Sequence, residues 1–148
     1  MIWKPNVVVA AIVEREGRFL LVEEEADGRP VFNQPAGHLD EGESLLNAVR
    51  RETWEETAWR IEPTALVGVY RWPKPDSDIT FLRFCFAARA VSHDPTAVLD
   101  KEILRAVWLA PTQIEALGER VRSPLVLRCL RDYQAGRRFD LAILQDLG

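Results

Sequence analysis

The chain has few cysteines and no long hydrophobic run. Cys85 and Cys129 are its only 2 cysteines, and each lies in an apolar stretch without metal-ligand spacing. This disfavours both a disulfide framework and a thiolate metal site, so we expect two core thiols and a reducing, cytoplasmic setting. The N-terminal apolar run from Val7 to Val13 is far shorter than the roughly 20 residues of a membrane-spanning helix. We expect neither a membrane span nor an export signal.

An excess of basic residues is also missing. The 19 Lys and Arg residues against 23 Asp and Glu residues give a net charge of -4. Proteins that bind nucleic acid polymers usually carry a strong basic surplus, so we do not expect a nucleic acid polymer as a partner. An apolar content of 47% and a charged content of 28% are typical of globular proteins. The length of 148 residues predicts one domain, residues 1–148, as either a monomer or a homodimer.

Hydrophobic patterning predicts an α+β fold. A helix is expected from Ser44 to about Thr57, and shorter ones after Pro111 and after Ser123-Pro124, where Ser suits the cap and Pro the first helical position. The amide-, Pro- and Gly-rich segment 33–37 predicts a loop. Strands are expected at 7–13, 19–22, 66–71, 80–91 and 106–109. Strands, one helix, strands and further helices in this order favour a mixed sheet in an α/β/α sandwich.

The helix expected from Ser44 carries two distinct faces. Five residues at offsets of three and four predict a buried stripe: Leu45, Leu46, Val49, Thr53 and Trp54. Glu52, Glu55 and Glu56 share another face, where like charges repel unless a cation lies between them. Carboxylate oxygens suit Mg²⁺ or Mn²⁺, which retain waters and leave room for substrate phosphates. A simple solvated acidic face is the alternative interpretation of the spacing alone.

Residues 37–59 resemble the signature of the Nudix hydrolase family. Six positions match its spacing, namely Gly37, Glu43, Arg51, Glu52, Glu55 and Glu56. The resemblance implies a Nudix-type sandwich with a loop-helix-loop catalytic motif. It also implies that Glu52, Glu55 and Glu56 hold Mg²⁺ or Mn²⁺, that the Gly37 carbonyl adds a ligand, and that Arg51 orients the carboxylates through ion pairs that include Glu43.

The signature has three departures, at Thr53, Ala58 and Trp59. The family usually has a glycine where Ala58 stands, and a glycine after a helix commonly takes a left-handed conformation in which alanine costs about 1 kcal/mol. If Ala58 has that conformation, we expect Ala58→Gly to stabilise the fold by about 1 kcal/mol. If the helix continues through Ala58, the substitution should destabilise it instead.

Beyond the motif, the chain resembles the NudJ-type phosphatases of this family. The similar segments are 33–39 (NQPAGHL), 81–84 (FLRF), 122–125 (RSPL) and 133–136 (YQAG). This resemblance implies a cytoplasmic Mg²⁺ enzyme that releases orthophosphate from nucleoside tri- and diphosphates and from thiamine-related pyrimidine diphosphates. Three alternatives stay open: a pyrophosphohydrolase that releases pyrophosphate, a Nudix module that binds nucleotides without cleaving them, and an isomerase that needs a positioned cysteine.

Several residues outside the motif are candidates for the site. By resemblance, Glu102 in the loop before Trp108 is the candidate for the outer base. Arg83 and Arg122 are candidate phosphate partners because a guanidinium forms charge-assisted hydrogen bonds with phosphate oxygens. The candidates for stacking on a base are Trp72, Tyr70 and Phe32, although aromatic residues in strands usually belong to the core. His38 and His93 are expected to serve as surface or packing residues.

Overall fold

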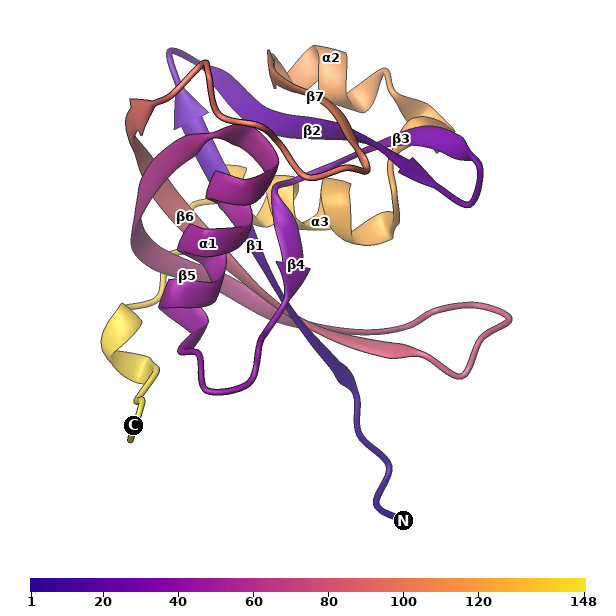
Figure 1. Cartoon of the computed structure of the whole chain (residues 1–148), viewed down its shortest axis with the longest axis vertical. Coiled ribbons are helices and arrows are strands. Elements are labelled where there is room, and N and C mark those ends of the chain that lie inside the picture. The colour runs from indigo at the N-terminus through magenta and orange to yellow at the C-terminus, as the bar shows by residue number, and fades with distance from the viewer.

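The computed structural model describes residues 1–148, which fold around one mixed sheet (Figure 1). The strands are β1 (Asn6–Arg15), β2 (Arg18–Ala26), β3 (Arg29–Asn33), β4 (Ala36–His38), β5 (Trp59–Pro73), β6 (Thr80–His93) and β7 (Ile103–Leu109). The helices are α1 (Leu45–Thr57), α2 (Pro111–Glu115) and α3 (Pro124–Gln134), with short 3₁₀ turns at Gly118–Arg120 and Leu141–Ile143. None of the helices is long and apolar enough to cross a membrane.

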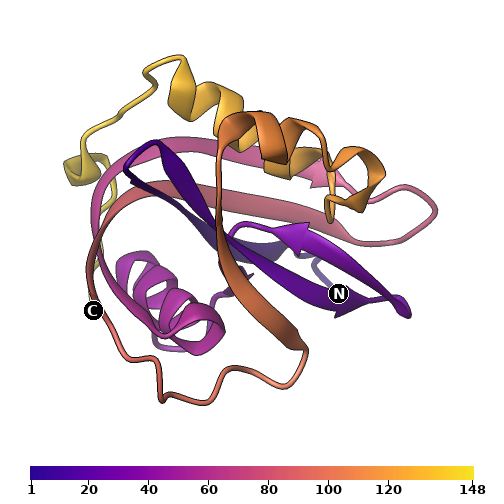
Figure 2. The same ribbon diagram turned by 90° about the horizontal axis from the view of Figure 1, so that it is seen from above.

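The sheet has the order β3-β2-β1-β6-β5, with β4 added to β1 and β7 added to β2. β1 and β6 run parallel, whereas the other pairs are antiparallel. Figure 2 shows α1 and α3 on opposite sides of the curved sheet. One core cluster, with Val9 and Phe86, packs beside α1, and the other, with Ala10 and Cys85, packs beside α3. The predicted α+β sandwich is confirmed.

Both cysteines belong to the core of the protein. Cys85 on β6 and Cys129 on α3 are free and fully buried. Both lie in the cluster beneath α3, so the expectation of two unbridged core thiols is confirmed. Neither side chain lines the cavity bounded by α1, β4 and the β2–β3 hairpin.

Several predicted element boundaries were wrong, and β3 was not predicted as a strand. β5 begins at Trp59, directly after α1, instead of at residue 66. The strand includes Pro63. Proline is tolerated there because β5 is an edge strand whose pairing with β6 shifts between Pro63 and Ala65. Within the predicted loop, residues 36–38 form β4, because pairing with β1 overrides local turn propensity.

The helix α1 begins as predicted but buries a slightly different stripe. Ser44 is the N-cap, and its Oγ accepts a hydrogen bond from the Asn47 amide at 3.1 Å. Val49 and Thr53 are fully buried, as expected, while Leu45, Leu46 and Trp54 are only half-buried. The stripe continues through Glu56, so one of the predicted metal-binding carboxylates lies on the buried side of the helix.

The helix ends at Ala58, which has the left-handed conformation with φ 59° and ψ 22°. Replacing Ala58 with glycine relieves about 1 kcal/mol of backbone strain. Ala58 is also buried, and its lost methyl group costs about 0.8 kcal/mol. We therefore expect Ala58→Gly to leave the free energy of unfolding within about 0.5 kcal/mol of wild type, a smaller effect than the sequence alone suggested.

The matched control is Ala48→Gly, at a buried position inside α1. There the methyl loss and the poor helix propensity of glycine add up to about 2 kcal/mol of destabilisation. Urea denaturation of both variants measures the difference. Equal destabilisation by the two substitutions would contradict the strained left-handed cap.

Candidate functional site

A cavity of about 440 Å³ opens where the sheet, α1 and the start of α3 meet. Its walls come from the β2–β3 hairpin, β4, α1, the β5–β6 hairpin, the loop before β7 and the first turn of α3. Among the lining residues are seven carboxylates, Glu24, Glu25, Asp27, Glu52, Glu56, Asp100 and Glu102. The cavity therefore combines a strongly acidic wall with a volume suited to a small ligand.

Three carboxylates converge beside α1. Glu52, Glu55 and Asp100 each present an oxygen, and these oxygens lie within 4.8 Å of one another. The Asp100 amide donates a hydrogen bond to the Glu55 carbonyl at 2.9 Å, which fixes the loop before β7 against the helix. Sequence reasoning missed Asp100, because only the fold brings this loop to α1. The loop itself was singled out, but for Glu102.

Glu52 and Glu56 are held by β4 through close backbone contacts. A Cβ atom at Gly37 would lie 2.1 Å from Glu52 Cδ, so only glycine allows this carboxylate to approach the strand. Glu56 is 5% exposed, and its Oε1 accepts a hydrogen bond from the Ala36 amide at 2.9 Å. The short strand β4 thus sets the position of both side chains.

Arg51 ties the motif together with hydrogen bonds from all three guanidinium nitrogens. Its Nε and Nη2 donate to the two carboxylate oxygens of Glu43 at 2.7 and 2.9 Å. Its Nη1 donates to Glu52 at 2.8 Å and to Glu55 at 3.1 Å, and Nη2 also donates to the His38 carbonyl at 3.0 Å. A lysine has a single ammonium group instead of a planar guanidinium with several donors, so it could not hold this set of acceptors in place.

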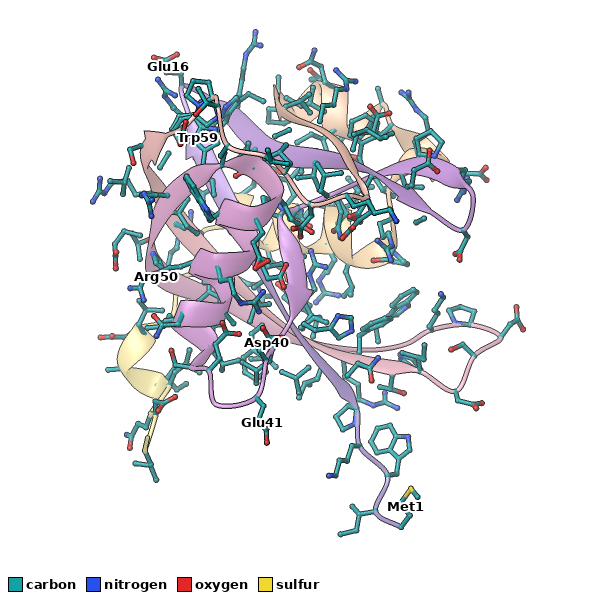
Figure 3. The ribbon with its side chains drawn as sticks, in the orientation of Figure 1. Met1, Glu16, Asp40, Glu41, Arg50 and Trp59 are labelled. Carbon is teal, nitrogen blue, oxygen red and sulfur yellow. The ribbon has the colours of Figure 1, made fainter.

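Arg51 also pairs with the loop that precedes α1. Its Nη2 lies 3.3 Å from an Asp40 oxygen. Figure 3 places Asp40 and Glu41 on this loop, at the start of α1, whereas Arg50 lies on the helix flank remote from β4 and pairs with Glu62. Neighbouring arginines of α1 therefore have different surroundings, and only Arg51 contacts the carboxylate cluster.

Burial and mutual repulsion change the acidity of the site. Desolvation raises the pKa of Glu52 to about 7 and that of Glu56 to about 9, with smaller contributions from neighbouring carboxylates. Desolvation, followed by the Glu55 charge, also raises the pKa of Asp100. By contrast, the hydrogen bond from Arg51 lowers the pKa of Glu43. Crowded, desolvated oxygens of this kind fit a hard divalent cation, which would favour their ionised forms.

The candidate residues outside the motif lie in different surroundings. Glu102 is exposed and lines the cavity, outside the three-carboxylate cluster. Arg122 also lines the cavity and forms an ion pair with the buried Glu24. His38 lines the cavity too, whereas His93 stacks on Trp59 with ring centroids 4.7 Å apart.

The aromatic candidates separate into two groups. Trp72 lines the cavity, where its ring stacks with Phe81 at a centroid distance of 6.0 Å. Tyr70 does not line it, which corrects the expectation of a stacking role. The Tyr70 hydroxyl instead donates to Asp132 on α3 at 2.8 Å, because α3 covers this part of β5. Phe32 is buried in the core and also lies outside the cavity lining.

Comparisons with known proteins agree on one family. The family model described as the NUDIX domain matches residues 3–129. The chain is 40% identical over 144 residues to phosphatase NudJ of Escherichia coli K12, with 97% of this chain and 93% of the relative covered. It is also similar to the solved structure of a NUDIX hydrolase from Nitrosomonas europaea, with a TM-score of 0.95, 46% identity and 97% of both chains covered. A second NUDIX hydrolase structure from this organism gives a TM-score of 0.77 and 26% identity, with 93% of this chain and 74% of the other covered.

Proposed function

The chain belongs to the Nudix hydrolase family and is a phosphohydrolase acting on phosphorus-containing anhydrides, and we propose that it uses Mg²⁺ to release orthophosphate from small diphosphate and triphosphate esters. The proposed substrates are nucleoside tri- and diphosphates and thiamine-related pyrimidine diphosphates, with Mn²⁺ as an alternative ion. The observation that carries the proposal is the convergence of Glu52, Glu55 and Asp100 within 4.8 Å at the edge of a ligand-sized cavity.

The donor set fits a hard divalent cation. We assign Glu52, Glu55, Glu56 and Asp100 to hold it, with the Gly37 carbonyl as a further ligand, because carboxylate and carbonyl oxygens are the ligands that Mg²⁺ prefers. The ion supplies charge neutralisation to the diphosphate and acidity to a water molecule. The close approach of Glu52 to Gly37 supports this assignment, since a site that needed no such contact would tolerate a Cβ atom there.

The remaining side chains orient the substrate and move a proton. Arg51 fixes Glu43, Glu52 and Glu55, so that the carboxylates need little reorganisation when the substrate binds. Glu102, exposed at the cavity wall, accepts the proton of the attacking water. Arg122 contacts a phosphate that is not attacked, and its pairing with Glu24 holds it at the cavity.

The alternatives are less consistent with this site. A module that binds without cleaving would be expected to lack motif carboxylates, whereas Glu52, Glu55 and Glu56 are all present. An isomerase needs a cysteine at the cavity, and Cys85 and Cys129 are both buried elsewhere. The pyrophosphohydrolase alternative differs only in which phosphorus is attacked, and product analysis separates it from our proposal.

We expect a nucleoside triphosphate to yield nucleoside diphosphate and orthophosphate first, followed by monophosphate and a second orthophosphate. Terminal attack depends on contacts to phosphates more than to a particular base, so kcat/KM should vary by less than about tenfold among the common bases. Ion-exchange analysis of an early time point measures the products. Pyrophosphate and monophosphate appearing together, without a diphosphate intermediate, would show that the pyrophosphohydrolase alternative is correct.

A further inference from the structure

Arg83 is a buried cation without an anionic partner. It is 4% exposed, on β6, and lines the cavity. No carboxylate lies within ion-pairing distance of it, although seven carboxylates line the same cavity. A guanidinium that is removed from water without a partner is costly, so its retention at a cavity indicates that a ligand contacts it.

The orientation of Arg83 is set by two side-chain amides. Its Nη2 donates to Gln34 Oε1 at 2.6 Å and to Asn33 Oδ1 at 3.4 Å. Gln34 is itself fixed, because its Nε2 donates to the Val126 carbonyl of α3 at 2.8 Å. The buried Nε of Arg83 has no hydrogen-bond partner. The side chain is thus held through Nη2, and Nε is enclosed by protein atoms, so Nη1, which forms no hydrogen bond, is the donor left for a ligand in the cavity.

The surroundings of Arg83 in the cavity are apolar and flat. On β1, the direct neighbour of Arg83 is Val8. Phe81 lies two residues away on the same side of β6, and it stacks with Trp72 of β5, the two rings inclined by only 14°. Leu125 of α3 completes this part of the lining. Figure 1 shows the β5–β6 hairpin projecting from the body of the protein, and the Trp72–Phe81 pair lies toward the outer end of this hairpin, next to the turn where β5 ends and β6 begins.

This apolar wall differs from the acidic wall that would meet the diphosphate. A phosphate placed against Val8, Phe81 and Leu125 would lose water on apolar side chains that offer it no hydrogen-bond donor. A planar ring fits these surfaces, and a ring nitrogen or carbonyl oxygen would satisfy the free guanidinium donor.

We propose that Arg83 determines specificity by donating a hydrogen bond to an acceptor atom on an aromatic or heteroaromatic ring of the substrate, which packs against Trp72 and Phe81. This inference rests on the proposed function and names the part of the substrate that lies beyond the diphosphate. Because every common nucleobase carries acceptor atoms, the arrangement favours rings over ringless esters without strong preference among bases.

The test compares two diphosphate esters, UDP, which has a ring with acceptor atoms, and isopentenyl diphosphate, which has no ring. Wild type should prefer UDP by at least about tenfold in kcat/KM, and Arg83→Met should lower the value for UDP by about 10- to 100-fold, as for one charge-assisted hydrogen bond. The value for isopentenyl diphosphate should change by less than about twofold. If turnover of isopentenyl diphosphate is too slow to follow, its inhibition constant against UDP hydrolysis is compared between wild type and Arg83→Met instead.

Two further variants keep the test interpretable. Trp72→Leu, on the half-exposed hairpin, leaves the buried amides intact and should also lower the preference for UDP, by about tenfold, through lost stacking. Arg71→Met is the matched control, since Arg71 is an exposed arginine on the same strand that does not line the cavity, and it should leave both substrates unchanged.

Equal losses for both esters in Arg83→Met would place the arginine on the diphosphate and overturn the proposal. So would an unchanged preference for UDP in both Arg83→Met and Trp72→Leu. A wild-type protein that cleaves neither ester in the presence of Mg²⁺ or Mn²⁺ would instead overturn the proposed function, so the two failures are distinguishable.

Discussion

Glu56→Gln should inactivate the enzyme while making the metal-free protein more stable. Activity should fall at least about 100-fold, the scale expected for the loss of one electrostatic stabiliser at a reacting centre. The stability gain follows from burial. Glu56 is 5% exposed, and burial raises its pKa in the folded protein to about 9, far above the usual 4.5 of a glutamate side chain. The uncharged amide resembles the protonated acid and can still accept the Ala36 hydrogen bond.

The sign of the stability effect depends on pH. A carboxyl group whose pKa is raised by folding stabilises the folded state fully below the unfolded pKa, and this contribution is lost as the pH rises toward the folded pKa. For Glu56 the loss extends from about pH 4.5 to about pH 9. At pH 8 we expect Glu56→Gln to raise the free energy of unfolding of the metal-free protein by about 2 to 4 kcal/mol, and at pH 4 to change it little.

Urea denaturation in EDTA at both pH values measures this effect, together with a turnover assay in Mg²⁺. The matched control is Glu41→Gln, which removes an exposed carboxylate on the loop before α1 and should alter neither activity nor stability. A Glu56→Gln protein that keeps its activity would refute the assignment of Glu56 to the site. A Glu56→Gln protein that is less stable than wild type at pH 8 would refute the conclusion that the buried Glu56 carboxylate destabilises the metal-free fold.

The sequence predicted the features that depend on local spacing. The start of α1 after Ser44 and its end near Thr57 follow from short-range chemistry, and the structure has both. The shared face of Glu52, Glu55 and Glu56 also follows from helical periodicity, although the buried environment of Glu56 does not. Burial depends on β4, a three-residue strand whose pairing with β1 is a tertiary contact.

The features that the sequence missed depend on which segments the fold brings together. Strand alternation places Tyr70 and Trp72 on one face of β5, so local reasoning treats them alike. Only the position of α3 separates them, because Asp132 on α3 takes the Tyr70 hydroxyl while Trp72 stays at the cavity. Asp100 likewise has no local pattern of its own, and its role depends on the contact between its loop and α1.

We propose that cleavage requires a divalent cation held by the α1 carboxylates and Asp100. Without the ion, these carboxylates would repel the diphosphate, so turnover depends on it completely. The most direct measurement follows orthophosphate release from UDP by the wild-type protein after EDTA treatment and after addition of excess Mg²⁺ or Mn²⁺. We expect release to fall to background in EDTA and to return with either ion. Release that continues unchanged in EDTA would contradict the claim.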